Sequence, residues 1–84
     1  MYKVFVVDDE YYARKCMAEF IKGLDNCEIA GQADNGETAL EEVLETNPDI
    51  LITDVKMPKM DGLTLIKKLR ENGKDDIKVI FMSA

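Results

Sequence analysis

The chain has 84 residues, which is enough for one small domain and too few for two. Apolar residues make up 46% and charged residues 33%, a composition typical of a globular chain rather than a disordered one. The net charge of −6 argues against binding to nucleic acid or to an anionic membrane surface, and the absence of histidine excludes a Ser-His-Asp triad and histidine metal ligands.

The first predicted strand is Val4–Val7, a continuous run of β-branched and aromatic residues typical of a strand that is covered on both faces. Acidic residues at 8–10 follow it, where a helix begins and its dipole favours negative charge. The next stretch predicts an amphipathic helix that ends at Gly23 or at the turn 25–26. The residues expected on its apolar face are Ala13, Cys16, Met17, Phe20, Ile21 and Leu24.

A second, shorter strand is predicted at residues 28–33, and the turn Asp34-Asn35-Gly36 follows it. Apolar residues at helical spacing over 39–44 predict a second helix, which Asn47-Pro48 ends. A third strand, at 50–53, is again continuously buried, and Asp54 stands at its end.

The stretch 56–62 is a predicted loop because it contains proline and glycine. A third helix follows, with leucine and isoleucine at positions 63, 65, 66 and 69, and it ends at Asn72-Gly73. The last predicted strand is 78–82, and Ser83 comes directly after it.

The alternation β-α-β-α-β-α-β predicts an α/β fold with a flavodoxin-like, doubly wound parallel sheet and right-handed crossovers. In such sheets, ligands bind beyond the carboxyl ends of the strands, where the strand order reverses. Asp8 with Asp9, then Asp54, then Ser83 follow the first, third and fourth strands, which are neighbours in the flavodoxin-like order. Polar residues far apart in the sequence are therefore expected to meet in one crevice.

The carboxylates of Asp8, Asp9 and Asp54 would repel one another in a partly dehydrated pocket, and a divalent cation would remove that conflict. Oxygen ligands without histidine or cysteine favour Mg²⁺, with Mn²⁺ as a substitute. A cation beside a carboxylate also suits phosphoryl transfer, because it neutralises the incoming oxygens while the carboxylate attacks phosphorus. The hydroxyl of Ser83 and the backbone amides of residues 56–59 could donate hydrogen bonds to the phosphoryl group.

Each of these acids also has a purely structural explanation, since Asp8 and Asp9 can cap a helix and Asp54 can end a strand. Taken singly, the structural explanation is favoured; taken together, acids after two buried strands and a hydroxyl after a third favour a functional site. Asp34-Asn35-Gly36 is better explained as a turn than as a metal loop. The sequence contains no glycine-rich phosphate loop.

The two cysteines, Cys16 and Cys27, are too few for the disulfide framework of a small secreted domain, and their spacing matches no zinc pattern. Cys16 falls on the apolar helix face, which predicts a buried thiol. The longest apolar runs have four residues, far short of a membrane-crossing helix or a signal peptide. These features predict a cytoplasmic, reduced chain with no membrane partner.

Three segments resemble the receiver domain of bacterial response regulators: VVDDE at 6–10, DNG at 34–36 and PDILITDVKMPKMDG at 48–62. The resemblance covers residues 2–84. It implies a non-enzymatic signalling protein of a two-component system, loaded by a sensor histidine kinase. The start of the chain looks like receivers that are fused to AraC-type DNA-binding domains, which implies transcription regulation by the whole protein.

The resemblance also implies residue roles. Asp54 would be the phosphoacceptor, and Asp9 would bind Mg²⁺ directly while Asp8 binds it mainly through water. Asp54 and the backbone carbonyl of Lys56 would be further ligands, and Ser83 would be the switch hydroxyl of the family. No lysine of this sequence can be assigned to the phosphate contact that the family's fifth strand supplies.

Residues 1–84 are expected to form an incomplete receiver, which lacks the fourth helix, the fifth strand and the fifth helix of the family. The fourth strand would then be an exposed apolar edge, which predicts a homo-oligomer through pairing with another copy. An alternative function stays open, in which the chain is a non-signalling receiver fragment whose main property is self-association. A haloacid-dehalogenase-like phosphatase is set aside because position 56 is lysine and not a second aspartate.

Overall fold

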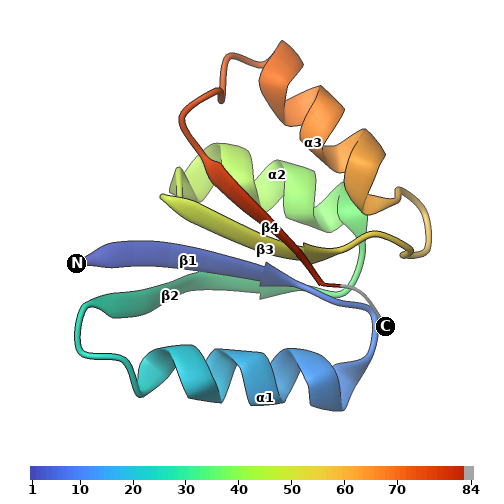
Figure 1. The fold of residues 1–84 in the computed structure, drawn as a ribbon. Helices are drawn as coiled ribbons and strands as arrows, with labels where there is room; N and C mark the ends of the chain where they lie inside the picture. The colour runs from blue at the N-terminus through green and yellow to red at the C-terminus, as the bar shows by residue number, and fades with distance from the viewer. Residues whose placement is uncertain (83–84) are drawn as a thin grey trace.

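Strands and helices alternate along the chain in the computed structural model, which describes residues 1–82 (Figure 1). This order is the predicted one, and each element begins and ends within about two residues of its predicted place. The elements are β1 (Tyr2–Val7), α1 (Tyr11–Lys22), β2 (Cys27–Ala33), α2 (Gly36–Thr46), β3 (Ile50–Asp54), α3 (Gly62–Glu71) and β4 (Lys78–Met82).

The four strands form one parallel sheet in the order β2-β1-β3-β4, which confirms the predicted doubly wound topology. β1 therefore lies beside β3, and β3 lies beside β4, although long stretches of sequence separate them. Because all four strands run in the same direction, their carboxyl ends share one edge of the sheet (Figure 1). That edge is where the candidate site lies.

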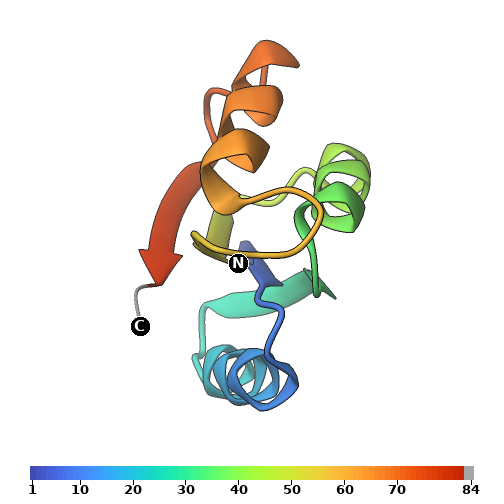
Figure 2. The same cartoon turned by 90° about the vertical axis from the view of Figure 1, so that its right-hand side faces the viewer.

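Helices cover both faces of the sheet: α1 lies on one side, and α2 and α3 lie on the other (Figure 2). The larger core forms between the sheet and the pair α2 and α3, and its fully buried side chains include Phe5, Leu51 and Leu65. A second cluster lies on the α1 side, where Ile21 packs with Val4 of β1. Val4–Val7 of β1 and residues 51–53 of β3 are buried, as their continuous apolar runs predict.

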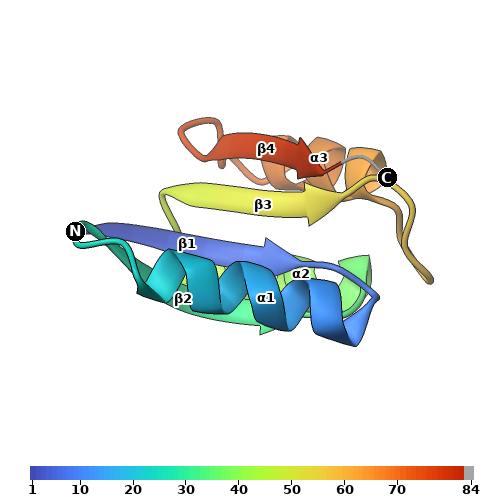
Figure 3. The same ribbon diagram turned by 60° about the horizontal axis from the view of Figure 1, so that its bottom comes forward.

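The α1 face of the sheet is only half covered in the described residues. Helix α1 lies over β1 and β2, whereas no described helix covers β3 and β4 on this face (Figure 3). The predicted burial of Cys16 is wrong: its side chain is exposed, and Phe20 is 66% exposed. The reason is that α1 turns Ala18 and Ile21 toward the sheet, while Phe20 instead lines an apolar groove of about 220 Å³ with Leu24 and other residues.

Each helix begins at a residue whose side chain accepts a hydrogen bond from a backbone amide. These residues are Glu10 for α1, Asn35 for α2 and Asp61 for α3. The segment 34–36 thus serves as the turn into α2, as predicted. Helix α2 ends at Asn47, which adopts the left-handed conformation with φ 48° directly before proline. None of the helices in residues 1–82 is long and apolar enough to cross a membrane.

Candidate functional site

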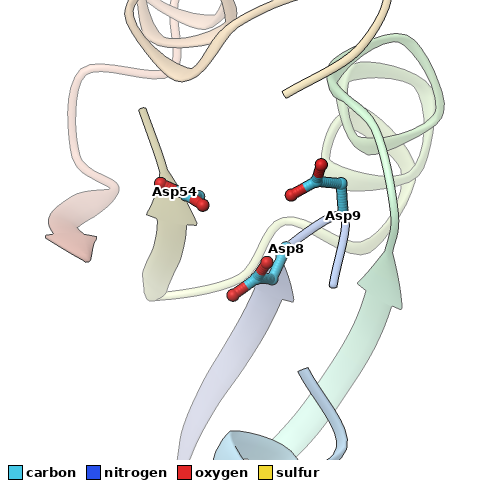
Figure 4. Close-up of side chains that lie close together, drawn as sticks. All are labelled: Asp8, Asp9 and Asp54. Atoms are coloured by element: carbon cyan, nitrogen blue, oxygen red, sulfur yellow. The ribbon is translucent and has the colours of Figure 1, made fainter. Parts of the chain in front are cut away.

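Three carboxylates meet at the carboxyl ends of two neighbouring strands. Asp8 and Asp9 directly follow β1, and Asp54 is the last residue of β3. Val7 pairs with Thr53 in the parallel ladder, so the two strands bring these acids to the same level of the sheet. One carboxylate oxygen from each of the three aspartates lies within 4.8 Å of the others, and Figure 4 shows the three side chains around a shared space.

Hydrogen bonds hold the segment from Asp8 to Glu10 in place. The amide of Asp8 donates to the carbonyl oxygen of Ala33 at 3.1 Å, which extends the pairing of β1 with β2 by one residue. The amide of Glu10 donates to Oδ1 of Asp8 at 2.9 Å, and Glu10 in turn caps α1 by accepting from the amide of Ala13. The strand end, the turn and the start of the helix are therefore one connected unit.

The loop after β3 holds Asp54 from the other side. The amide of Val55 donates to Oδ1 of Asp54 at 2.8 Å, and the amide of Gly62 donates to the carbonyl oxygen of Val55 at 2.7 Å. A methyl group on Gly62 would collide with the carbonyl oxygen of Asp54, so only glycine allows α3 to begin so close to the acid. Met57 and Met60 pack against the larger core and anchor the loop between the strand and the helix.

The three acids differ in their exposure to solvent. Asp8 is only 6% exposed, Asp54 is half-buried and Asp9 is exposed. Burial raises the pKa of Asp8, and the charges of Asp54, Asp9 and Glu10 raise it further, while the hydrogen bond from the amide of Glu10 acts in the opposite direction. The site disfavours the ionised form of Asp8. A bound cation would stabilise that form, because it would offset the negative charge of the cluster.

The donor set fits a hard divalent cation. All three side chains offer carboxylate oxygens, and the chain contains no histidine that would draw a transition metal to the site. Mg²⁺ keeps several water ligands and needs only one or two carboxylates, which a shallow cluster such as this can provide. The geometry therefore fits Mg²⁺ better than a metal that requires a closed protein cage.

The other predicted site residues are placed as follows. Lys56 lies in the loop two residues after Asp54, and its side chain is exposed. Ser83, the predicted switch hydroxyl, lies outside the described residues. Sequence reasoning missed Arg14, whose guanidinium donates a hydrogen bond to the carbonyl oxygen of Asp8 at 2.8 Å. The only sequence signal for it is a basic residue one helical turn after a run of acids.

A parallel α/β sheet with clustered acids at the ends of its central strands defines a doubly wound domain with an acidic cluster at the carboxyl ends of its strands. The family model of the response regulator receiver domain matches residues 4–84, and the chain belongs to this family. This result confirms the resemblance that the sequence motifs indicated.

Among curated relatives, a protein-glutamate methylesterase/protein-glutamine glutaminase of Syntrophomonas wolfei is 41% identical over 70 residues, which cover 83% of this chain and 20% of that protein. The response regulator GacA of Pseudomonas syringae is 39% identical over 80 residues, which cover 95% of this chain and 37% of GacA. The chain thus spans much less than half the length of these relatives.

Among solved structures, the response regulator domain of Thermotoga maritima CheB superposes with a TM-score of 0.89 at 28% identity. The match covers 96% of this chain and 59% of that one. The shared architecture supports the observed strand order.

Proposed function

We propose that this chain receives a phosphoryl group on Asp54 from a sensor histidine kinase, in the cytoplasm and as part of a two-component system. The observation that carries the proposal is the position of Asp54 at the end of β3, with a carboxylate oxygen within 4.8 Å of oxygens of Asp8 and Asp9. Membership of the receiver family supports the same role.

The proposed cation is Mg²⁺, with Mn²⁺ as a substitute. Asp9 and Asp54 would bind it directly, Asp8 would act mainly through water, and the backbone carbonyl of Lys56 would complete the protein ligands. When bound, the cation neutralises the charge of the carboxylates and of the incoming phosphoryl oxygens. The cation would thus offset the burial of Asp8 and the repulsion from its acidic neighbours, both of which raise the pKa of Asp8.

The proposed reaction is a displacement at phosphorus. An oxygen of Asp54 attacks the phosphorus of a phosphohistidine, the phosphorus–nitrogen bond breaks, and its electron pair returns to the imidazole nitrogen, which takes up a proton. The product is an acyl phosphate on Asp54. Because Oδ1 accepts the amide of Val55, Oδ2 is the oxygen left to attack. We propose that Ser83 then donates its hydroxyl to the phosphoryl group.

The role proposed here is reception of the signal and not enzymatic turnover. The chain matches only 20% of the methylesterase relative, so methylesterase activity is not carried over to it. We propose that the receiver controls an output elsewhere in the full protein, with transcription regulation through an AraC-type DNA-binding domain as the specific proposal. The comparisons give no support to the alternative of a receiver fragment that no longer signals.

Self-association through β4 is a separate proposal about partners. Within the described residues β4 pairs with β3 alone, and Ile80 and Phe81 on it are 52% and 41% exposed. An apolar strand with a free edge is a template for pairing with a second copy. Sedimentation over a wide concentration range is expected to show dimers that the variant Ile80→Lys lacks, and a monomer throughout would contradict the proposal.

The phosphoryl transfer is tested with a small-molecule phosphodonor and Mg²⁺, followed by intact mass. The wild type is expected to gain one phosphoryl group, and the variant Asp54→Asn to gain none, because an amide oxygen is a poor nucleophile. Asp75→Asn is the matched control, since Asp75 is exposed and precedes β4 at the opposite edge of the sheet. Equal labelling of Asp54→Asn and wild type would show that another residue accepts the phosphoryl group.

A further inference from the structure

One positively charged side chain, that of Arg14, contacts the backbone between Asp8 and Asp9. Arg14 is half-buried in the first turns of α1, and its Nη1 donates to the carbonyl oxygen of Asp8 at 2.8 Å. Its guanidinium carbon lies 5.5 Å from the ring centroid of Tyr11, so the ring supports the side chain in this position. The long side chain thus folds back from the helix onto the end of β1.

The oxygen that Arg14 binds belongs to the peptide unit that joins Asp8 to Asp9. A peptide unit is planar, so fixing its carbonyl oxygen also fixes the amide of Asp9 on the opposite side. The orientation of that plane, together with the φ angle of Asp9, sets the direction in which the side chain of Asp9 leaves the backbone. Asp9 is exposed, so packing against the core does not fix this side chain.

The other hydrogen bonds of this turn do not involve the carbonyl oxygen of that peptide. Ala33 holds the amide of Asp8, and the amide of Glu10 holds Oδ1 of Asp8. The second bond closes a ring that contains the peptide between Asp8 and Asp9, but neither bond contacts the carbonyl oxygen of that peptide. The hydrogen bond from Arg14 is therefore the contact by which a side chain of α1 holds this carbonyl oxygen.

We propose that Arg14 is a positioning residue of the divalent cation site: it holds the peptide between Asp8 and Asp9 so that both carboxylates converge with that of Asp54. This inference rests on the proposed function, which supplies the cation. Side chains that orient metal ligands without touching the metal commonly change metal affinity by about tenfold or more when they are removed.

The positive charge of Arg14 acts on the cation in the opposite direction. A guanidinium close to the site repels a divalent cation, so loss of the charge alone would tighten binding. Loss of the hydrogen bond would weaken binding, because the carboxylates would no longer be held in a converging arrangement. The two effects differ in sign, so the sign of the change in affinity identifies which of them dominates.

The experiment is calorimetric titration of the chain with Mg²⁺ alone, at constant ionic strength. The variant Arg14→Met keeps the apolar stem and removes the donor and the charge, and we expect its affinity to fall about tenfold. The variant Arg14→Lys keeps a charged donor and is expected to recover most of the affinity. Lys15→Met is the matched control, because Lys15 is an exposed neighbour that carries the same charge and does not contact the turn. The affinity of this variant for Mg²⁺ is expected to equal that of the wild type or to be slightly higher.

Each outcome has a defined meaning. If the wild type binds Mg²⁺ and Arg14→Met binds it equally or more tightly, the positioning role is wrong. The same conclusion follows if the urea midpoint of Arg14→Met falls in the absence of Mg²⁺ while its affinity is unchanged, because that result describes a purely structural residue. If the wild type itself fails to bind Mg²⁺, the proposed function fails instead. Should Arg14→Met not fold, Arg14→Leu, which also lacks a donor and a charge, carries the same test with the same expected direction.

Discussion

Asp8 is the acid of the cluster whose ionised form is most disfavoured by its surroundings. It is the most buried of the three acids, and burial together with the charges of Asp54, Asp9 and Glu10 raises its pKa above the ordinary value of 3.8. A carboxyl with a higher pKa in the folded chain than in the unfolded chain binds its proton more tightly when folded. The free energy of unfolding therefore falls as the pH rises from about 3.8 through the raised pKa.

The variant Asp8→Asn is expected to stabilise the metal-free protein at neutral pH by about 1 kcal/mol, the size common for stabilising charge changes. The amide oxygen of asparagine can still accept the bond from Glu10, so the turn is preserved while the charge is removed. Urea unfolding measures the gain, which should disappear at a pH below 3.8, where Asp8 is protonated in both states.

The control for this variant is Asp25→Asn, in the exposed turn after α1, which should leave the unfolding free energy nearly unchanged. A metal-free Asp8→Asn protein that is less stable than wild type at neutral pH would contradict the expected repulsion. It would show instead that ionised Asp8 stabilises the turn.

At the scale of the element, the caps of α2 and α3 have different responses to pH. Asp61 caps α3 by accepting from the amide of Thr64 at 2.8 Å, and this bond is the largest cause of its lowered pKa. Asn35 caps α2 by accepting from the amide of Thr38 at 2.9 Å and does not titrate. A carboxyl with a lowered pKa stabilises the fold above its ordinary pKa and loses that effect as the pH falls through the lowered value.

The paired variants Asp61→Ala and Asn35→Ala test this difference. Both are expected to lower the free energy of unfolding at neutral pH, Asn35→Ala by about 1 kcal/mol as is usual for loss of a cap. The loss in Asp61→Ala should shrink as the pH falls below 3.8, whereas the loss in Asn35→Ala should stay constant. Urea titrations at several pH values measure both, and a pH-independent loss in Asp61→Ala would mean that its charge contributes nothing to the cap.

Helix α1 shows where sequence reasoning about elements reaches its limit. Its apolar periodicity correctly predicts a helix, but the apolar stripe is wider than the strip of helix that meets the sheet. The structure buries Ala18 and Ile21, while Cys16 and Phe20 are exposed. Leu63 on α3 is likewise 59% exposed, although it belongs to the predicted stripe. Periodicity records which residues are apolar, and the packing partner decides which of them are covered.

The candidate site was more predictable than the helix faces because topology alone brings its acids together. Parallel strands place their carboxyl ends at one edge of the sheet, so acids at the ends of β1 and β3 must lie close together once these strands are neighbours. Arg14 could not be found in this way, because it acts on a backbone carbonyl. The sequence shows a basic residue one helical turn after a run of acids, but its partner is a backbone atom, which only the folded turn identifies.

At the scale of the whole molecule, two effects of a divalent cation must be separated. The net charge of −6 means that any added salt weakens the repulsion within the folded chain, whether or not a site exists. A cation that binds only the folded state adds a stabilisation that grows with its concentration, about 1.4 kcal/mol for each tenfold increase above the dissociation constant. Screening and site binding therefore depend differently on concentration at fixed ionic strength.

The midpoint temperature of thermal unfolding is expected to rise steadily with the logarithm of the Mg²⁺ concentration when NaCl is adjusted to keep the ionic strength constant. The variant Asp9→Asn should lose this rise, because it removes the exposed carboxylate of the cluster with little effect on the core. Asp25→Asn lowers the negative charge by the same amount away from the cluster and should keep the rise. If both variants and the wild type respond equally, Mg²⁺ acts on the net charge of the molecule and not on the edge of the sheet where the three carboxylates meet.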